Sequence, residues 1–158
     1  MTADRERYRD LARNRKAFHL YEFLDRFEAG IALKGYEVKS ARAGKIQLTD
    51  AYASVENGQL WLFQCHITPY DHHSHEGFEP PNPGRRRKLL MHRDEIKRLR
   101  AKIVEKGLTL IPLRIYLKGS LVKVELGLGR GKKAYDKRET IRRRDQERDA
   151  ARELRERG

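Results

Sequence analysis

Hydrophobic residues are concentrated between positions 18 and 128, where they recur at the spacing of short strands. The segments LTLIPLRIYL and LVKVELGL alternate most regularly, and they flank a turn at residues 118–120. Alternation with a period of two places one set of side chains on each face of a sheet. We therefore expect a β-hairpin whose first strand turns one face inward, formed by Ile111, Leu113, Ile115 and Leu117. Pro112 predicts that this strand lies at an edge or begins there.

A second hairpin is predicted at Asn57 and Gly58, which stand between AYASVE and QLWLFQCHI. This pair tolerates the positive φ angles of a type I′ turn. Residues 17–33 contain short apolar groups interrupted by glycine, so we expect two strands there, with a bulge or tight corner near residues 28–30.

Two helices are also predicted. The segment GYEVKSARAGK is expected to form a short helix that ends at Gly44. A second, amphipathic helix opens at Asp94 and Glu95 and stops at Gly107. Residues 68–87 hold four of the five prolines and three of the six histidines without an apolar pattern, which predicts a long loop.

This arrangement predicts a mostly β fold with a few helices, of which a small OB-fold-like β-barrel is the leading form. A split α+β sandwich is the alternative. We expect a flexible N-terminal arm at 1–13, the barrel at 14–131 and a basic C-terminal tail at 132–158. The tail is expected to be disordered when free and helical when bound, because beyond Ile141 its only other large apolar residue is Leu154.

The net charge of +13 predicts a polyanionic partner. Nucleic acid is favoured over a membrane surface, because no stretch approaches the roughly 20 apolar residues of a spanning helix. The N-terminal residues lack the apolar segment of a secretion signal, and the single cysteine, Cys65, excludes an intramolecular disulfide. A cytoplasmic protein with a buried thiol at Cys65 is therefore expected.

Two basic segments are candidate RNA contacts. The run Arg85, Arg86, Arg87 and Lys88 directly precedes apolar residues, so it is held against a folded surface and predicts a phosphate clamp. A solvated charge run is the alternative. The segment GRGKKAYDKRE combines glycines, which let an RNA backbone approach, with Tyr135, which either stacks on a base or covers the barrel end.

No catalytic or cofactor motif accompanies these segments. The histidines of DHHSHEG lack a second ligand cluster, so adventitious binding is favoured over a structural metal site. Phosphate-cradle, nucleophile-elbow and zinc-protease motifs are missing from the sequence. We expect no enzyme activity and no cofactor, and an RNA-processing enzyme using His66 or Asp50 is kept as an alternative.

Several longer segments resemble the SmpB family in order and spacing from Asn14 to Arg144: FEAGIALKGYEVKSARAGK, RKLLMHRDEI, EKGLTLIPLRIYLK, VKVELGLGRGKK and YDKRETI. The resemblance implies an OB-fold barrel that binds the tRNA-like domain of transfer-messenger RNA (tmRNA). It also implies a tail that enters the empty mRNA channel beyond the decoding centre of the 16S rRNA in a stalled 70S ribosome. Alanyl-tRNA synthetase and elongation factor Tu would act indirectly, through the RNA. A general OB-fold translation factor or ribosomal protein with nonspecific RNA binding is the alternative.

The resemblance also assigns roles to single residues. It implies RNA binding at Asn14, Glu28, Leu90, Lys123 and Gly131, and ribosome contact at Tyr135, Asp136, Lys137 and Arg138. Glu28 either accepts hydrogen bonds from the RNA or orients a basic side chain, and Leu90 is either core or a stacking platform. Neighbouring basic residues complete the predicted RNA-binding set: Arg15, Lys16, Lys39, Arg42, Lys45, Arg130, Lys132 and Lys133. Some family members carry His where Tyr135 stands, and residues 82–88 are more basic than the family pattern.

Overall fold

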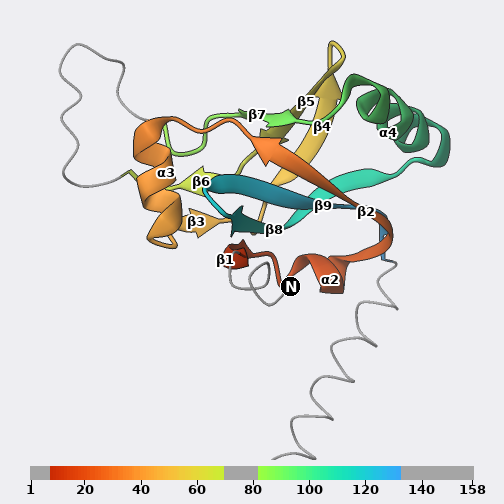
Figure 1. The fold of residues 1–158 in the computed structure, drawn as a ribbon. Helices are drawn as coiled ribbons and strands as arrows, with labels where there is room; N and C mark the ends of the chain where they lie inside the picture. Colours follow the sequence, from red (N-terminus) through yellow and green to blue (C-terminus); the bar gives the residue numbers. More distant parts are fainter. Residues whose placement is uncertain (1–7, 70–81, 133–158) are drawn as a thin grey trace, which may run out of the picture.

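The computed structural model describes residues 8–69 and 82–132 (Figure 1). Its elements follow one another as β1 (Tyr8–Arg13), α2 (Ala17–Leu20), β2 (Tyr21–Ile31), α3 (Gly35–Arg42), β3 (Ile46–Gln47), β4 (Tyr52–Glu56), β5 (Gln59–Phe63), β6 (His66–Ile67), β7 (Arg87–Leu90), α4 (Arg93–Lys106), β8 (Thr109–Lys118) and β9 (Leu121–Gly131). Within these ranges, no helix is long and apolar enough to cross a membrane.

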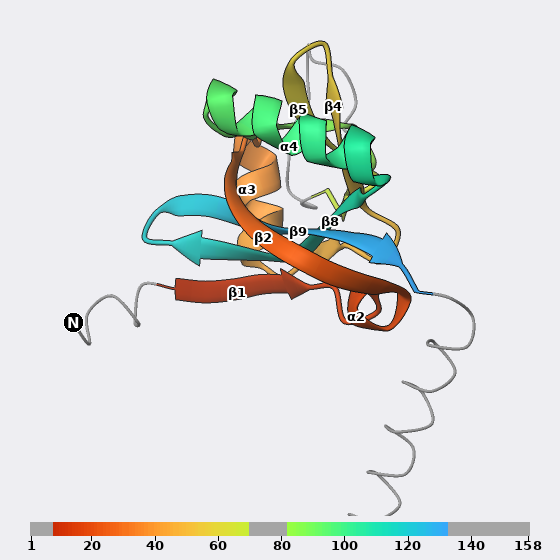
Figure 2. The same ribbon diagram turned by 90° about the vertical axis from the view of Figure 1, so that its right-hand side faces the viewer.

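The main sheet closes on itself. Its strands are paired in the order β1-β8-β4-β5-β7-β2-β9, and β8 also pairs with β9. That last pairing completes a ring of β8, β4, β5, β7, β2 and β9, while β1 is added along β8. In a closed sheet, each strand of the ring is paired on both sides, so none has an unpaired edge. The expected β-barrel is confirmed, and the sandwich alternative is wrong. Helices α3 and α4 lie on different sides of the barrel (Figures 1 and 2).

The predicted turns and helix ends are confirmed where a glycine adopts a positive φ angle. Asn57 and Gly58 join β4 to β5 with φ angles of 52° and 73°. Gly107 ends α4 in the left-handed conformation, and Gly119 turns β8 into β9. At the start of α4, the His92 side chain accepts a hydrogen bond from the Asp94 backbone N–H at 3.3 Å.

The expected N-terminal arm is partly wrong. Residues Tyr8–Arg13 form β1, which pairs with β8 from Lys118 to Arg114. Leu11 enters the hydrophobic core, whereas Arg9 and Arg13 are exposed. A single apolar residue among charged neighbours is too weak a pattern to predict a strand, and the pairing depends on a partner about a hundred residues away. Residues 1–7 lie outside the described ranges.

The segment at 17–33 also differs from expectation. It forms the one-turn helix α2 and then one strand, β2, whose register against β9 shifts between Phe23 and Asp25 instead of near Gly30. Gly30 continues the strand between Leu90 of β7 and Lys123 of β9. A Cβ atom there would lie 3.2 Å from the Leu90 Cβ, so this glycine serves a close approach of two strands.

A bulge in β8 divides the face that was predicted to be continuous. The register against β9 shifts between Pro112 and Arg114. Ile111 and Leu113 consequently pack with Ala17 in a small cluster, whereas the main core receives Ile115 and Leu117. Pro112 lies beside this bulge, in the interior of β8, where a residue without a backbone N–H is tolerated.

Candidate nucleic-acid interface

Strand register brings several predicted RNA-binding residues to one outer face of the barrel. Gly30 of β2 stands opposite Leu90 of β7 on one side and Lys123 of β9 on the other. Lys123 in turn stands opposite Tyr116 of β8. Paired positions of neighbouring strands project to the same side of a sheet. We call this surface, which spans β1, β8, β9, β2 and the end of β7, the β9 face.

Leu90 contributes an apolar patch to the β9 face. Its side chain is 53% exposed and lies beside the bare backbone of Gly30. The core interpretation of Leu90 is therefore wrong, and the surface-platform interpretation agrees with the structure.

Glu28 is hydrogen-bonded within the protein. Its carboxylate accepts hydrogen bonds from the Tyr116 hydroxyl and from Lys118 Nζ, the latter at 3.4 Å. The Tyr116 hydrogen bond and the nearby lysines hold the pKa of Glu28 below its ordinary value despite partial burial. The carboxylate is thus ionised and engaged by donors, which agrees with the interpretation that Glu28 orients a basic neighbour.

Arginine side chains neutralise the other carboxylates of this face. Arg114 donates to Asp10 at 2.8 Å and to Glu125 at 2.9 Å. Arg26 reaches Glu125 from the β2 side at 3.1 Å. Burial alone would raise the pKa of Asp10, but its hydrogen bonds from Arg13 and Arg114 outweigh it and lower that pKa. These pairs form a network across four strands that fixes the side chains in place.

The sequence analysis missed several residues of the β9 face, among them the exposed Tyr8 and Lys118 and also Tyr116, which is only 2% exposed. The rings of Tyr8 and Tyr116 stack with centroids 5.9 Å apart, and Lys118 Nζ lies 5.7 Å from the Tyr8 centroid. The signal was present in IPLRIYLK, where Arg, Tyr and Lys alternate with apolar residues and so point outward.

A second group of basic residues lies where α2 meets the end of β9. Arg15, Lys16 and Arg130 are exposed there. Lys132 donates its backbone N–H to the Leu20 carbonyl at 2.8 Å and its Nζ to the Phe18 carbonyl at 3.1 Å. The last described residues are thereby attached to α2, and Gly131 stands opposite Tyr21.

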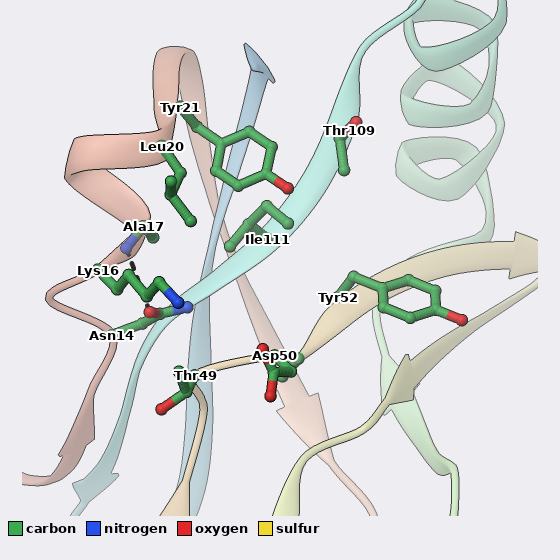
Figure 3. Close-up of a pocket in the computed structure, with 11 residues that line it drawn as sticks. Asn14, Lys16, Ala17, Leu20, Tyr21, Thr49, Asp50, Tyr52, Thr109 and Ile111 are labelled. Atoms are coloured by element: carbon green, nitrogen blue, oxygen red, sulfur yellow. Dashed lines mark hydrogen bonds between the residues drawn. The ribbon is translucent and has the colours of Figure 1, made fainter. Parts of the chain in front are cut away.

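A cavity of about 310 Å³ opens beside α2, and Figure 3 shows side chains that line it. Its lining includes Lys16, Tyr21, Asp50 and Tyr52. Asn14 also borders it, but this side chain is nearly fully buried. The lining holds one residue of each charge, Lys16 and Asp50, so the cavity adds no net positive charge to the surface around α2.

Asn14 is a structural residue, which corrects its assignment as an RNA contact. Its Nδ2 donates to the carbonyls of Pro112 at 3.0 Å and Leu48 at 3.2 Å, and its Oδ1 accepts from the Ala17 N–H at 3.2 Å. All polar atoms of the side chain are engaged inside the protein. Asn14 therefore fixes α2, and with it Lys16, and its engaged polar atoms favour this structural role over a direct RNA contact.

Arg87 is also structural, so the predicted phosphate clamp is wrong at this position. The side chain is 0% exposed. Its guanidinium donates to Glu37 at 2.8 Å and to the carbonyls of Cys65, Arg85 and Pro83 at 2.5, 3.0 and 3.0 Å. A guanidinium has five N–H donors, and these contacts leave it no free edge for a phosphate.

Arg85 shares the Glu37 carboxylate with Arg87, which removes a second member of the predicted clamp. Its Nε lies 3.2 Å from Glu37 Oε2, and its Nη2 makes a shorter contact with Oε1. Arg86 and Lys88 remain exposed. The clamp is thus divided, since alternate residues of this segment point to opposite sides.

The basic residues of α3 stand apart from the β9 face. Lys39 and Arg42 are exposed on the helix, Lys45 is half-buried after it, and the Arg42 carbonyl accepts a hydrogen bond from Arg9 at 2.7 Å. The ribosome-directed residues Tyr135, Asp136, Lys137 and Arg138, together with Lys133 and the His-rich segment at 71–77, lie outside the described residues.

The pairing of Glu37 predicts acid sensitivity. Burial alone would raise the pKa of Glu37, but hydrogen bonds from Arg85 and the Lys34 N–H, with the charge of Arg87, hold it below its ordinary 4.5. A carboxyl group whose pKa is lower in the folded than in the unfolded protein stabilises the fold at any pH above the unfolded-state pKa. This stabilisation is lost as the pH falls from the unfolded-state pKa through the folded-state pKa. Urea unfolding from neutral pH down through this range should show a falling midpoint. Glu37→Gln should flatten the dependence, and parallel curves for both proteins would contradict this origin.

The groups considered for metal binding or catalysis can be placed in the described residues. They contain no group of three or more His, Cys, Asp or Glu side chains placed to hold a metal ion. Burial raises the pKa of the Cys65 thiol to about 11, so it is protonated at neutral pH and is a poor nucleophile. His66 and Asp50, the candidates for an RNA-processing enzyme, are exposed.

Comparisons with known proteins show what the chain as a whole is similar to. The family model described as "SmpB protein" matches residues 11–156. An SsrA-binding protein of Carboxydothermus hydrogenoformans is 54% identical over 147 residues, covering 93% of this chain and 97% of the relative. An SsrA-binding protein of Synechocystis sp. is 51% identical over 154 residues, covering 98% and 99%. A solved structure, described as "tmRNA-SmpB: a journey to the center of the bacterial ribosome", matches with a TM-score of 0.65 and 49% identity, covering 84% of this chain and 94% of the solved chain.

Proposed function

The chain belongs to the SmpB family, and from this premise we propose that it binds the tRNA-like domain of tmRNA and delivers it to stalled ribosomes for trans-translation. Its partners are then tmRNA and the bacterial ribosome. The family binds RNA, and we propose that this member acts as a noncatalytic adaptor without a cofactor. Its place is the cytoplasm, where ribosomes work.

The observation that supports the binding site best is the convergence of Glu28, Leu90 and Lys123 on the β9 face. An exposed leucine beside a glycine provides a flat apolar contact for a ribose or base. Lys118 and Lys123 provide positive charge next to it, and the ionised Glu28 is already satisfied by Tyr116. This combination of a stacking surface with charge suits folded RNA, whose grooves and loops display sugars, bases and phosphates together.

We further propose that Lys16, Arg130 and Gly131 extend this contact around α2, and that residues 132–158 act toward the ribosome. The support is positional. Lys132 is attached to α2, so the chain leaves the barrel beside these basic residues. The segment that follows contains the DKR motif at Asp136–Arg138 and is rich in arginine. Its individual contacts stay a prediction.

A competition experiment tests the proposed specificity. The full-length protein should prefer the tRNA-like domain of tmRNA over elongator tRNA by at least about a hundredfold near physiological ionic strength, where nonspecific phosphate binding is weakened. Equal binding to the two RNAs would contradict the proposal and favour a general translation factor.

Lys123→Ala tests the site. We expect about tenfold weaker binding to the tRNA-like domain, and a slope of log affinity against log salt that is smaller by about 1, because one phosphate contact is lost. Lys106→Ala removes the same charge from the exposed end of α4 and should change neither quantity. If the two variants bind alike, Lys123 is not at the interface.

A further inference from the structure

The outer side of the β4–β5 hairpin carries an aromatic surface that the proposed function does not use. Tyr52 of β4 stands opposite Phe63 of β5, and their rings stack with centroids 5.2 Å apart and an interplanar angle of 17°. Trp61 lies two residues before Phe63 and therefore projects to the same side. The alternate residues Leu60 and Leu62 are fully buried in the core. We call the surface formed by Tyr52, Trp61 and Phe63 the aromatic strip.

Basic side chains border the aromatic strip on the β7 side. The Arg86 guanidinium lies over the Trp61 ring, 4.3 Å from its centroid. Lys88 of β7 stands opposite Trp61 and is exposed. Glu56, at the hairpin tip, is paired with Arg86 at 3.4 Å. With Lys88 added, the two basic residues outnumber this one carboxylate, so the border of the strip is net positive.

Another basic side chain borders the strip on the α4 side. Arg100 lines, together with Tyr52 and Ser54, a cavity of about 460 Å³ between α4 and β4. Tyr52 is 38% exposed, so one ring of the strip is open to solvent between this cavity and Phe63. Positive charge thus lies on both long sides of a row of aromatic rings.

We propose that the aromatic strip is a second RNA-binding surface, which stacks unpaired nucleobases of a single strand. Bases of every type stack on aromatic rings, and flanking Arg and Lys side chains contact the phosphates. The guanidinium of Arg86 already lies on the indole of Trp61, so it can exchange with a base or extend the stack. On a barrel of this type, the outer faces of strands commonly bind oligonucleotides.

The strip is centred on the β4–β5 hairpin and meets the β9 face at β7, where Lys88 borders the strip and Leu90 belongs to the β9 face. The β4–β5 hairpin and β1 are at opposite ends of the molecule in both views (Figures 1 and 2). An RNA that covers the β1 side of the β9 face therefore leaves the β4–β5 hairpin accessible to another strand or to a distant part of the same RNA. This inference does not depend on the identity of the RNA bound by the β9 face.

Trp61 is the only tryptophan of the chain, so its fluorescence reports directly on the strip. The full-length protein should be titrated with an unstructured single-stranded RNA of about eight nucleotides, within the site size of one OB fold. We expect saturable quenching of Trp61. Polyphosphate, a polyanion without bases, should give none. Equal quenching by polyphosphate, or no quenching while the labelled RNA is seen to bind, would overturn the proposal.

Variants of the strip should weaken the same titration. Tyr52→Leu keeps an apolar side chain but removes a stacking ring, and we expect about tenfold weaker binding. Lys88→Gln changes an exposed residue outside the core, so its expected threefold loss cannot arise from misfolding. Tyr8→Leu removes a similarly stacked tyrosine from the β9 face and should leave the Trp61 titration unchanged. Unchanged affinity in both strip variants would overturn the proposal. Competition for the tRNA-like domain should be unaffected by Phe63→Leu, which changes the ring that stacks on Tyr52 and does not line the cavity beside α2, so failure here is distinguishable from failure of the β9 face.

Discussion

Arg87→Ala is expected to lower the free energy of unfolding by about 3–5 kcal/mol, because it removes one partner of a buried ion pair. Glu37, whose side chain is only 3% exposed, would keep Arg85 as its only ion-pair partner beside the Lys34 backbone N–H. The carbonyls of Cys65, Arg85 and Pro83 would also lose a donor, and unsatisfied buried polar groups each carry a desolvation cost. A loss of this size is a large part of the stability of a small domain.

Urea unfolding of Arg87→Ala beside Lys88→Ala measures this effect directly. The two residues are adjacent, carry the same charge and differ in burial, since Lys88 is exposed. Lys88→Ala should change the unfolding free energy by at most about 0.5 kcal/mol. Arg87→Lys should also be destabilising, because an ammonium group cannot serve carbonyls and a carboxylate on several sides at once. A stable Arg87→Ala protein with weakened RNA binding would instead restore Arg87 to the phosphate clamp.

Arg87 also illustrates why part of the site was beyond sequence analysis. Its carboxylate partner, Glu37, lies 50 residues earlier, and the Cys65 carbonyl to which it donates lies 22 residues earlier. Asn14 similarly reaches the Pro112 carbonyl across 98 residues. A polar residue is buried only where the rest of the fold supplies its hydrogen-bond partners. Composition and spacing show a basic run or a lone asparagine, and neither reveals those partners.

Local signals were sufficient elsewhere. The Asn57–Gly58 turn and the stop of α4 at Gly107 depend on backbone conformations that few residues tolerate, so they were predictable one segment at a time. The alternation in LVKVELGL is also consistent with the structure, since Val124, Leu126 and Leu128 of β9 enter the core. Strand order, by contrast, is a property of the whole chain. The grouping of Leu90 with Lys123 became visible only when β7 and β9 were found on either side of β2.

Two glycines of the LGLGRG segment, Gly129 and Gly131, differ in the space around them: one is crowded and the other is open. Substitutions at these two positions can therefore separate an effect on folding from an effect on RNA binding. Gly129 faces the bulge of β2, where a Cβ atom would collide with the Glu22 carbonyl and lie 3.0 Å from the Phe23 Cα. These are backbone atoms and cannot rotate away. Gly131 has nothing within 4 Å of the same position, so a methyl group there points into open space. The fold therefore requires glycine at 129 and not at 131.

Gly129→Ala should consequently lower the free energy of unfolding by about 3 kcal/mol, near the upper end for overpacking, because β2 and β9 must move apart. Gly131→Ala should stay within about 0.5 kcal/mol of the parent protein in the same urea experiment. If Gly131 is needed for close approach of RNA, as we propose, Gly131→Ala should still bind the tRNA-like domain several-fold more weakly. A lower free energy of unfolding in Gly131→Ala, or an unchanged one in Gly129→Ala, would contradict the assignment of Gly129 to folding and Gly131 to RNA binding. A stable Gly131→Ala protein with unchanged affinity would confine the RNA contact to the β9 face.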